Sequence, residues 1–494
     1  MKTGIPARMT ALLLALCLLL PCAARAEGDG MIRTVVEATC TEAGYVLITD
    51  PATDATRVEH LPAAGHAFGP WTVDEAAGRE TRQCSVCGHS ETVRISTVSE
   101  EAMPKLHLTG SLEGIGKKSK VTLEAAFESP ELRFGGYAVM TLQGHSTFGL
   151  PKRNYTIRFF RDAEGESKKK VQFAGWREEH KYILKANYYD LTQSRNLAGA
   201  RLWSEMTACR EGLSPRLAAL PTLGAVDGFP VDVYLNGSYL GLYTMNLHKD
   251  DDLYGLLEGE ESALVICNRQ TSDESLFRAP AAFLEDYSSD WEIEYCGTLD
   301  EAWVRESFNG LIAFVGDSDD ETFRQELPRR LDVNAAIDYL LLIYALGLPE
   351  SGAKDMVMLH LDGLWIPAAF DMDGAFGLDV SGGGDLPAES FLPRRTDGVW
   401  DSGTGSLLWD RLLNNYEEEI RARYRQLRTT LLTEEHLLSL VTGLTGLIPE
   451  RSYDLDNNLY PGRPLADTDM PAQIAAFIPL RLSCLDEALE VEIP

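Results

Sequence analysis

Two aspartates one residue apart are the residues of this chain best suited to chemistry. Asp371 and Asp373 follow the apolar run 364–370, and Gly374 and Gly377 supply flexible backbone soon afterwards. Residues i and i+2 of a strand point the same way, so both carboxylates would face one spot at a strand end. Two hard oxygen donors suit Mg²⁺ or Mn²⁺, ions that commonly carry the phosphates of a nucleotide. The spacing alone also fits an Asp-Gly turn with two exposed acids.

Residues 1–26 are typical of a signal peptide. A basic start, an unbroken apolar run at 11–20 and an Ala-Arg-Ala cleavage site at 24–26 follow one another. The run is too short to span a bilayer. We therefore expect an exported protein, secreted or at the cell surface. Cys22 is a poor lipid-attachment site because Pro21 stands where a small residue is wanted, so a lipoprotein is the less favoured alternative.

Charge and length limit the possible function classes. The 494-residue chain has a formal net charge of −30, and loss of residues 1–26, which contain three basic residues and no acid, makes it −33. This charge argues against a nucleic-acid partner, whose phosphates require lysine and arginine. The remaining 468 residues are enough for a large core and two or more domains. No later segment has 18 consecutive apolar residues, so we expect no transmembrane helix.

Three cysteines lie in a small module at residues 31–95. Cys84 and Cys87 form a Cys-x-x-Cys-Gly knuckle, and Cys40 stands alone upstream. Short β-prone runs between turn residues predict a small β-rich unit. The three cysteines and one histidine could bind zinc. The candidates for the histidine are His66, His89 and His60. A disulfide between two of the three cysteines, or neither arrangement, remains open, since seven cysteines survive cleavage and cannot all pair.

From residue 104 to about residue 490 the sequence predicts one large α+β domain. Alternating apolar and polar residues, the pattern of strands, occur at 120–127, 137–142 and 154–160. Asn236-Gly237 between two apolar runs predicts a β-hairpin. A helix is expected at 192–207, and helices dominate beyond residue 300. The later helices are expected at 302–315, 333–345, 406–427 and 434–447.

Four segments occur in an order that matches one protein family. They are residues 142–147 (Leu-Gln-Gly-His-Ser-Thr) with 151–157 (Pro-Lys-Arg-Asn-Tyr-Thr-Ile), then residues 183–196, 231–243 and 370–377. In this order they resemble the CotH (spore-coat protein H) kinase family of exported atypical protein kinases. The resemblance covers about residues 104–490. It implies a divergent protein-kinase-like fold that transfers the γ-phosphoryl group of ATP to Ser or Thr of an extracellular or surface protein. The module at 31–95 resembles a repeat of exported Gram-positive proteins.

The resemblance implies roles for individual residues. Asp371 and Asp373 match the family's DxD element and would hold Mg²⁺ or Mn²⁺ as catalytic residues. Lys152 follows the turn near the nucleotide and would steady the phosphates of ATP. Ser146 belongs to that turn and is expected to contact the cofactor. Lys185, beside a predicted buried strand, is the second candidate for the cation, although its side chain could also reach the surface.

Two further cofactor-binding candidates lie near the start of the helix predicted at 192–207. Arg195 and Asn196 match a stretch in which the family has Asp, Arg and Asn close together. An alternative gives Asp190 and Arg195 a structural role, as a helix N-cap and a scaffold salt bridge.

The segment before the aspartate pair departs from the family's pattern. Glu350 stands where the catalytic Asp is expected, and Asp355 replaces an Asn that could ligate metal. Because Glu is one methylene longer, a base there would be displaced by about an ångström, which can cost roughly a hundredfold in rate. Gln143 and His145 also replace the family's Arg and Asn. A weakened kinase or a pseudokinase therefore stays open.

Two other function classes compete with an active kinase. In one, the large domain is a non-catalytic scaffold of a surface protein, and the N-terminal module contacts a partner. The other, a metal-dependent hydrolase, would need a histidine-rich site, and no histidines cluster outside the N-terminal module. The leading prediction is an exported CotH-like kinase that uses ATP with Mg²⁺ or Mn²⁺, in which Glu350 positions the hydroxyl of a protein substrate.

Overall fold

The computed structural model describes residues 23–26, 30–61, 63–144, 146–284, 289–379, 384–466 and 468–493. The predicted signal peptide lies outside these ranges except for 23–26. The fold is a mixture of helices and sheets, as the α+β prediction requires. Among the described residues, none of the helices combines the length and apolarity that a membrane span needs.

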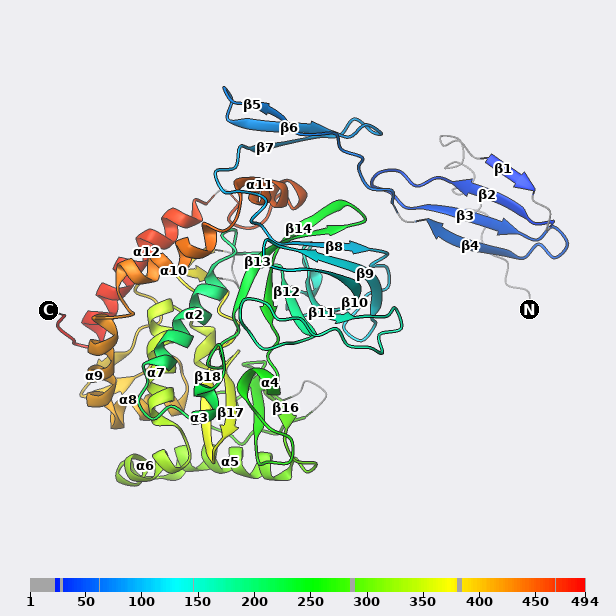
Figure 1. Ribbon diagram of the computed structural model, residues 1–494. Coiled ribbons are helices and arrows are strands. Elements are labelled where there is room, and N and C mark those ends of the chain that lie inside the picture. The colour runs from blue at the N-terminus through cyan, green and yellow to red at the C-terminus, as the bar shows by residue number, and fades with distance from the viewer. Residues whose placement is uncertain are drawn as a thin grey trace, which may run out of the picture.

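Two small antiparallel sheets precede the large domain (Figure 1). The first has the strand order β1 (Ala23–Ala26), β2 (Ile32–Val36), β3 (Gly44–Thr49) and β4 (Thr56–Leu61). The second consists of β5 (Thr72–Asp74), β6 (Arg79–Gln83) and β7 (Ser90–Arg94). These sheets occupy the segment for which a β-rich module was expected. The second sheet contacts helix α11 (Glu450–Leu459), whereas the first sheet extends away from the large domain.

Seven strands of the large domain close into a barrel, which the sequence did not reveal. In barrel order they are β10 (Arg133–Gln143), β11 (Asn154–Phe160), β12 (Lys181–Lys185), β14 (Ser238–Leu247), β13 (Gly228–Leu235), β8 (Lys105–Thr109) and β9 (Val121–Glu128). Only the contact between β13 and β8 is parallel among these pairs. A closed barrel leaves no free strand edge. The hairpin predicted at Asn236-Gly237 is confirmed, and both residues have the positive φ angles that such a turn requires.

A second sheet lies beside the barrel and leads into the aspartate pair. Its strand order is β16 (Trp291–Cys296), β15 (Ala263–Cys267), β17 (Val357–Leu361) and β18 (Leu364–Ala368), all antiparallel. The residues of β17 and most of β18 are buried, because this sheet packs between the barrel and the helices. Short two-stranded pairs complete the sheets of the described chain. They are β19 (Leu378–Asp379) with β20 (Gly384–Asp385), and β21 (Arg394–Thr396) with β22 (Val399–Asp401).

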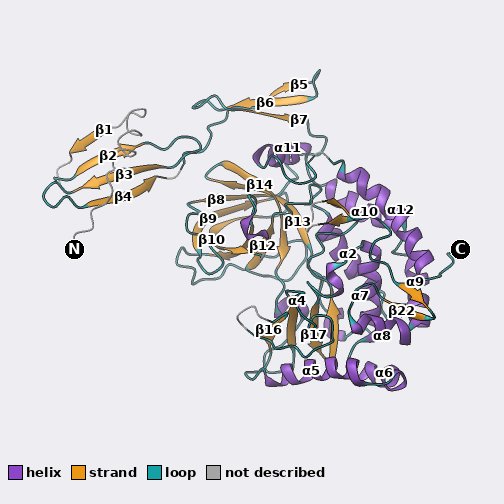
Figure 2. Cartoon of the chain, turned by 180° about the vertical axis from the view of Figure 1, so that it is seen from behind, coloured by secondary structure: helices purple, strands orange, loops and turns teal. Residues whose placement is uncertain are grey.

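The helices gather on the opposite side of the molecule from the barrel (Figure 2). α7 (Val333–Leu346) is apolar on almost every side, and its residues 335–346 are buried. Around it and the second sheet lie α2 (Arg195–Ala208), α5 (Ala302–Asp317), α6 (Asp320–Glu326), α8 (Leu407–Asn415), α9 (Glu417–Arg428), α10 (Glu434–Thr445) and α12 (Met470–Ala488). Single turns occur at α3 (Pro215–Ala218), α4 (Asp251–Tyr254), η1 (Ser146–Gly149), η2 (Leu327–Arg329) and η3 (Glu350–Gly352). The helix predicted at 406–427 is two helices, α8 and α9, which meet at Tyr416.

Helix α11 is joined to the barrel by a buried ion pair. The ammonium nitrogen of Lys152 lies 2.9 Å and 3.0 Å from the two carboxylate oxygens of Asp456, and it donates to the carbonyl of Leu242. Arg463 Nη1 lies 2.9 Å from the same carboxylate. Burial lowers the pKa of Lys152 to about 8, although Asp456 opposes the shift. The lysine is fully buried and pairs with α11, so the prediction that Lys152 steadies phosphates is wrong.

The outer face of α11 holds the second N-terminal sheet. Arg94 at the end of β7 forms an ion pair with Asp454, with a shortest separation of 2.8 Å. Arg451 pairs with Glu80 of β6 and lies over the ring of Trp71, 4.6 Å from its centre. The same helix therefore contacts the barrel on one side and the N-terminal module on the other.

Replacement of Asp456 by Asn is expected to lower the free energy of unfolding by about 3–5 kcal/mol, because Lys152 would keep a buried charge without a carboxylate partner. Asp454→Asn is the matched control on the same helix. It removes a pair with the exposed Arg94 and should cost about 1 kcal/mol or less. Urea unfolding of both variants measures the difference, and equal losses would contradict a structural role for the Lys152 ion pair.

Candidate functional site

The loop that carries the two aspartates leaves the end of β18. Ala368 is the last residue of that strand, and Asp371 has a φ angle of 53°, in the left-handed region. Residues other than glycine seldom adopt this conformation, so neighbouring contacts must hold the turn in place.

The start of α2 supplies those contacts. Nη1 of Arg195 donates hydrogen bonds to the carbonyls of Ala375 at 2.7 Å and Phe376 at 2.9 Å. The side-chain oxygen of Asn196 accepts a hydrogen bond from the backbone N–H of Met372 at 2.9 Å. Arg195 is 1% exposed. The structure therefore assigns Arg195 to positioning the aspartate loop and corrects the expectation that it contacts the cofactor.

Asp190 fixes the start of α2 in turn. Its carboxylate accepts hydrogen bonds from the backbone N–H groups of Thr192 at 3.0 Å and of Ser194 and Arg195 at 2.9 Å. A carboxylate at a helix N-terminus satisfies free donors and interacts favourably with the helix dipole. These contacts agree with the structural alternative considered for Asp190 and Arg195.

Lys185, the last residue of β12, connects the barrel to the aspartate loop. Its ammonium nitrogen lies 2.8 Å from Oδ1 of Asp373 and is hydrogen-bonded to Oδ1 of Asp371. The Lys185 side chain is 11% exposed. Of the two lysines considered for the phosphate-binding cation, the structure brings Lys185 to the aspartates and places Lys152 elsewhere.

Burial and mutual interaction set the acidity of the three groups. Burial raises the pKa of Asp373 to about 6, and the charge of Asp371 adds to the rise while Lys185 opposes it. Burial also acts upward on Asp371, but Lys185 outweighs it and lowers the pKa of that carboxyl. Both carboxylates raise the pKa of Lys185 against the effect of burial. Carboxyl groups with shifted pKa values beside a fixed cation are common in functional sites.

Glu350 and Asp355 line the same region and share one lysine. Nζ of Lys354 lies 2.6 Å from Oε2 of Glu350 and 2.9 Å from Oδ2 of Asp355. Burial, followed by the charge of Asp371, raises the pKa of Asp355 to about 7. Lys354 was not among the predicted site residues. Its position four residues after Glu350, a spacing at which helical side chains meet, was the available signal.

Two cavities meet at Asp371. The first, which we name the Ile183 cavity, has a volume of about 250 Å³. Its lining includes Ile183, Lys185, Ala200, Val226, Asn246 and Phe370. The second, which we name the Glu350 cavity, has a volume of about 260 Å³. Its lining includes Thr147, Tyr189, Glu350, Lys354, Asp355 and Asp373. Asp371 lines both cavities, so the carboxylate pair stands where the two spaces join.

The turn at 143–147 runs between these cavities. Gln143 lines the Ile183 cavity, and Thr147 lines the Glu350 cavity. Gly144 has a φ angle of 99°, and a side-chain carbon there would lie 2.1 Å from Oγ1 of Thr147, so glycine is required. The side chain of Ser146 and all of His145 lie outside the described residues. The turn thus lies beside the aspartates, as expected for a segment near a nucleotide.

The oxygen atoms around Asp371 fit a divalent cation. The Asp373 side chain is 27% exposed, and its Oδ1 lies 2.8 Å from the nitrogen of Lys185. Asp371, Asp373 and Asp355 present the carboxylate donors that Mg²⁺ and Mn²⁺ prefer.

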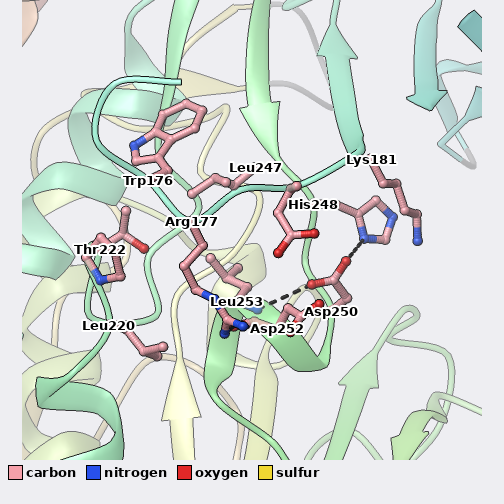
Figure 3. A pocket seen from close by; sticks show the side chains of 12 residues that line it. Trp176, Arg177, Lys181, Leu220, Thr222, Leu247, His248, Asp250, Asp252 and Leu253 are labelled. Carbon is pink, nitrogen blue, oxygen red and sulfur yellow. Dashed lines mark hydrogen bonds and ion pairs between the residues drawn. The ribbon is translucent and has the colours of Figure 1, made fainter. Parts of the chain in front are cut away.

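A third and much smaller pocket adjoins the Ile183 cavity, with which it shares Leu247 and His248 (Figure 3). Asp250 accepts hydrogen bonds from His248 and from the backbone of Leu253, as the dashed lines show. The volume of this third pocket, about 30 Å³, has room for little more than a water molecule. We therefore do not assign a substrate to this pocket.

The predicted metal ligands of the N-terminal module also come together. Cys40, His66, Cys84 and Cys87 form one group that could hold a metal ion. His89 stacks on His66, and His60 lies on β4. Of the three candidate histidines, His66 is the one that joins the cysteines.

A family model described as CotH kinase protein matches residues 140–464, about two-thirds of the chain. The matched part contains the turn at 143–147, Lys185, Glu350 and the aspartate pair. Among curated proteins, none matches this sequence. The family match confirms the resemblance inferred from the four segments, and the chain belongs to the CotH kinase family.

Proposed function

We propose that the chain is an exported atypical protein kinase with a divergent protein-kinase-like fold. It transfers the γ-phosphoryl group of ATP to Ser or Thr of extracellular or surface proteins. The proposal is carried by the contact of Lys185 with Asp371 and Asp373 at the junction of two cavities. Phosphoryl transfer needs a fixed cation, carboxylates for metal, and separate spaces for nucleotide and acceptor. Membership of the CotH family supports a phosphotransferase.

The Ile183 cavity suits the base of the nucleotide. Ile183, Ala200 and Val226 give it an apolar wall on which a planar ring can pack. Asn246 lines the same cavity and offers an amide that can pair with the polar edge of a base. With the base there, the phosphates extend toward Lys185.

The carboxylates beside Lys185 would hold the metal ions of the nucleotide complex. Asp371 and Asp373 are the proposed ligands, and Asp355 adds a carboxylate in the place of the family's Asn. A bound Mg²⁺ or Mn²⁺ supplies neutralisation of the charge that develops on the phosphate oxygens. The ammonium group of Lys185 would remain at the junction of the cavities as a fixed positive charge for the phosphates. Asn196 and Arg195 keep the aspartate loop in register with the barrel through their bonds to its backbone.

The Glu350 cavity suits the acceptor hydroxyl. The hydroxyl oxygen forms a bond to the γ-phosphorus while the bond from that phosphorus to the β,γ-bridging oxygen breaks, and ADP leaves with that oxygen. The hydroxyl proton passes to the carboxylate of Glu350. Lys354 orients this carboxylate at 2.6 Å. Lys354 can keep this contact during the reaction, because it occupies Oε2 of Glu350 and leaves Oε1 to accept the hydroxyl proton.

A weakened or inactive kinase is the second candidate, and Lys354 favours it. This lysine pairs with both Glu350 and Asp355, so the carboxylate that would act as the base is already held in an ion pair. Such a protein would bind nucleotide and transfer its phosphoryl group slowly or not at all. It would then act as a surface protein that contacts its partners without modifying them.

The first test compares Asp373→Asn with Glu350→Gln. Asp373→Asn is expected to remove Mn²⁺-dependent nucleotide binding, because it takes away a metal ligand. Glu350→Gln should keep binding and reduce phosphoryl transfer by roughly 100-fold or more, as loss of a general base does. Calorimetry measures binding, and transfer of γ-labelled phosphate to the chain or to an added Ser/Thr-rich protein measures the reaction.

Asp362→Asn, in the turn at the far end of β17 and β18, is the control that should behave as wild type. Nucleotide binding without transfer in wild type would select the inactive alternative. Absence of nucleotide binding by wild type in Mn²⁺ would contradict both candidates.

Replacement of Lys185 by Met separates nucleotide binding from metal binding. Nucleotide affinity should fall by roughly 10- to 100-fold, the range expected when a charged hydrogen bond is lost. Mn²⁺ alone should bind at least as tightly, because the lysine no longer competes for Asp371 and Asp373. Lys181→Met, four residues earlier on β12, is the matched control and should change neither affinity. Electron paramagnetic resonance of free Mn²⁺ gives the metal affinity, and unchanged nucleotide binding in Lys185→Met would exclude its phosphate role.

Filling the Ile183 cavity should block the base without touching the carboxylates. Ala200→Leu places a larger side chain against the apolar wall and is expected to weaken nucleotide binding while Mn²⁺ binding persists. Ala208→Leu, exposed at the end of the same helix, is the control. If Ala200→Leu folds as wild type and binds nucleotide equally well, the base lies somewhere else.

A further inference from the structure

Four side chains converge on one point between the two N-terminal sheets. The sulfurs of Cys40, Cys84 and Cys87 and a ring nitrogen of His66 all lie within 4.8 Å of one another. The sulfurs of Cys40 and Cys84 are 3.8 Å apart, and the sulfur of Cys87 is 3.2 Å from Nδ1 of His66. Two sulfurs bound 2.3 Å from a tetrahedral zinc ion are about 3.8 Å apart. The separations therefore match those of ligands around one small ion.

The backbone of the Cys84–Cys87 knuckle is shaped to hold a thiolate. The N–H of Val86 points to the sulfur of Cys84 at 3.4 Å, and the N–H of Gly88 donates to the Cys84 carbonyl at 3.0 Å. Gly88 closes the turn with a φ angle of 75°. His89 stacks on the ring of His66, with centroids 4.7 Å apart and planes 18° from parallel, and so holds its orientation. Ligands held in this way lose little freedom when they bind an ion.

The N-terminal module has too small a core to explain its structure by itself. Its fully buried apolar side chains among the described residues before residue 96 are Cys40, Ile48, Cys84 and Val93. Two of these four are members of the cysteine group. Modules with so little buried apolar surface generally require a metal or disulfides for stability. A disulfide would use two of the cysteines and leave one thiol and the imidazole without a role at this point.

We propose that Cys40, His66, Cys84 and Cys87 bind one Zn²⁺ as a closed structural site. Sulfur and imidazole ligands are those that zinc prefers, and four protein ligands leave no open position for catalysis. The three thiols lose their protons on binding, and no oxidation is involved. The site is separate from the proposed kinase site, and the proposal does not depend on kinase activity.

The position of the ligands defines what the zinc ion does. Cys40 lies between β2 and β3, His66 lies between β4 and β5, and the knuckle lies between β6 and β7. The ion therefore joins the first sheet to the second. The second sheet is held on α11 by contacts that do not involve the ion, namely those of Arg94 and Arg451. Loss of zinc should free the first sheet and leave the large domain folded.

Metal analysis of the whole purified chain is the first test, and one zinc per chain is expected. Replacement by Co²⁺ should give the intense visible bands of a tetrahedral site together with sulfur-to-metal charge transfer in the near ultraviolet. Cys84→Ser should lose the metal. Cys209→Ser, which changes an exposed cysteine of the large domain, should keep it.

Chelation of wild-type protein tests the same proposal without a substitution. Removal of zinc should increase proteolytic cleavage within residues 31–70, whereas Mn²⁺ and nucleotide binding by the large domain should stay unchanged. The proposal is overturned if the chain is free of metal and all three thiols react with a thiol reagent, or if its mass is lower by two hydrogens because of a disulfide among them. Retention of one full zinc by Cys84→Ser would also overturn it.

Discussion

The pairing of Lys185 with two partly buried aspartates is the interaction around which the large domain is arranged. Two carboxylates that share one lysine repel each other, and partial burial makes the repulsion stronger because water screens it less. The barrel supplies the cation at the end of β12, and the second sheet supplies the carboxylates after β18. Both parts must therefore be in register before the charges are balanced. Arg195 and Asn196 at the start of α2 maintain that register through the backbone of the aspartate loop.

The sequence was sufficient for those features that local patterns encode. The aspartate pair, the Asn236-Gly237 hairpin and the strand at 154–160 follow from spacing and turn chemistry over a few residues. The boundary between α8 and α9 was missed because both helices continue one apolar pattern across Tyr416. Closure of the barrel was also missed, since it depends on β8 and β13 pairing across more than a hundred residues. No local pattern encodes a contact of that kind.

The two lysines show why site residues are harder to assign than elements. Lys152 lies just before β11 and Lys185 is the last residue of β12, and their immediate neighbours do not distinguish them. Their ionic partners distinguish the two lysines. Lys152 is paired with Asp456, about three hundred residues later, and Lys185 is paired with the aspartate pair. A buried lysine needs a carboxylate wherever it lies, so burial alone does not indicate function. The cysteine group is a similar case. Cys40 stands alone in the sequence, and only the fold brings it close to the Cys84–Cys87 knuckle.

Helix α11 has contacts on both of its sides, and this has a consequence for the order in which the molecule opens. Its inner side carries Asp456 in the core, and Ser452 donates a hydrogen bond to Asp232 of the barrel. Its outer side carries Arg451 and Asp454. Detachment of α11 would expose a cluster of ionic groups at once, whereas release of the first N-terminal sheet breaks few such contacts. We therefore expect native-state hydrogen exchange to find α11 in the same cooperative unit as the barrel, and the first sheet in a separate unit of lower stability.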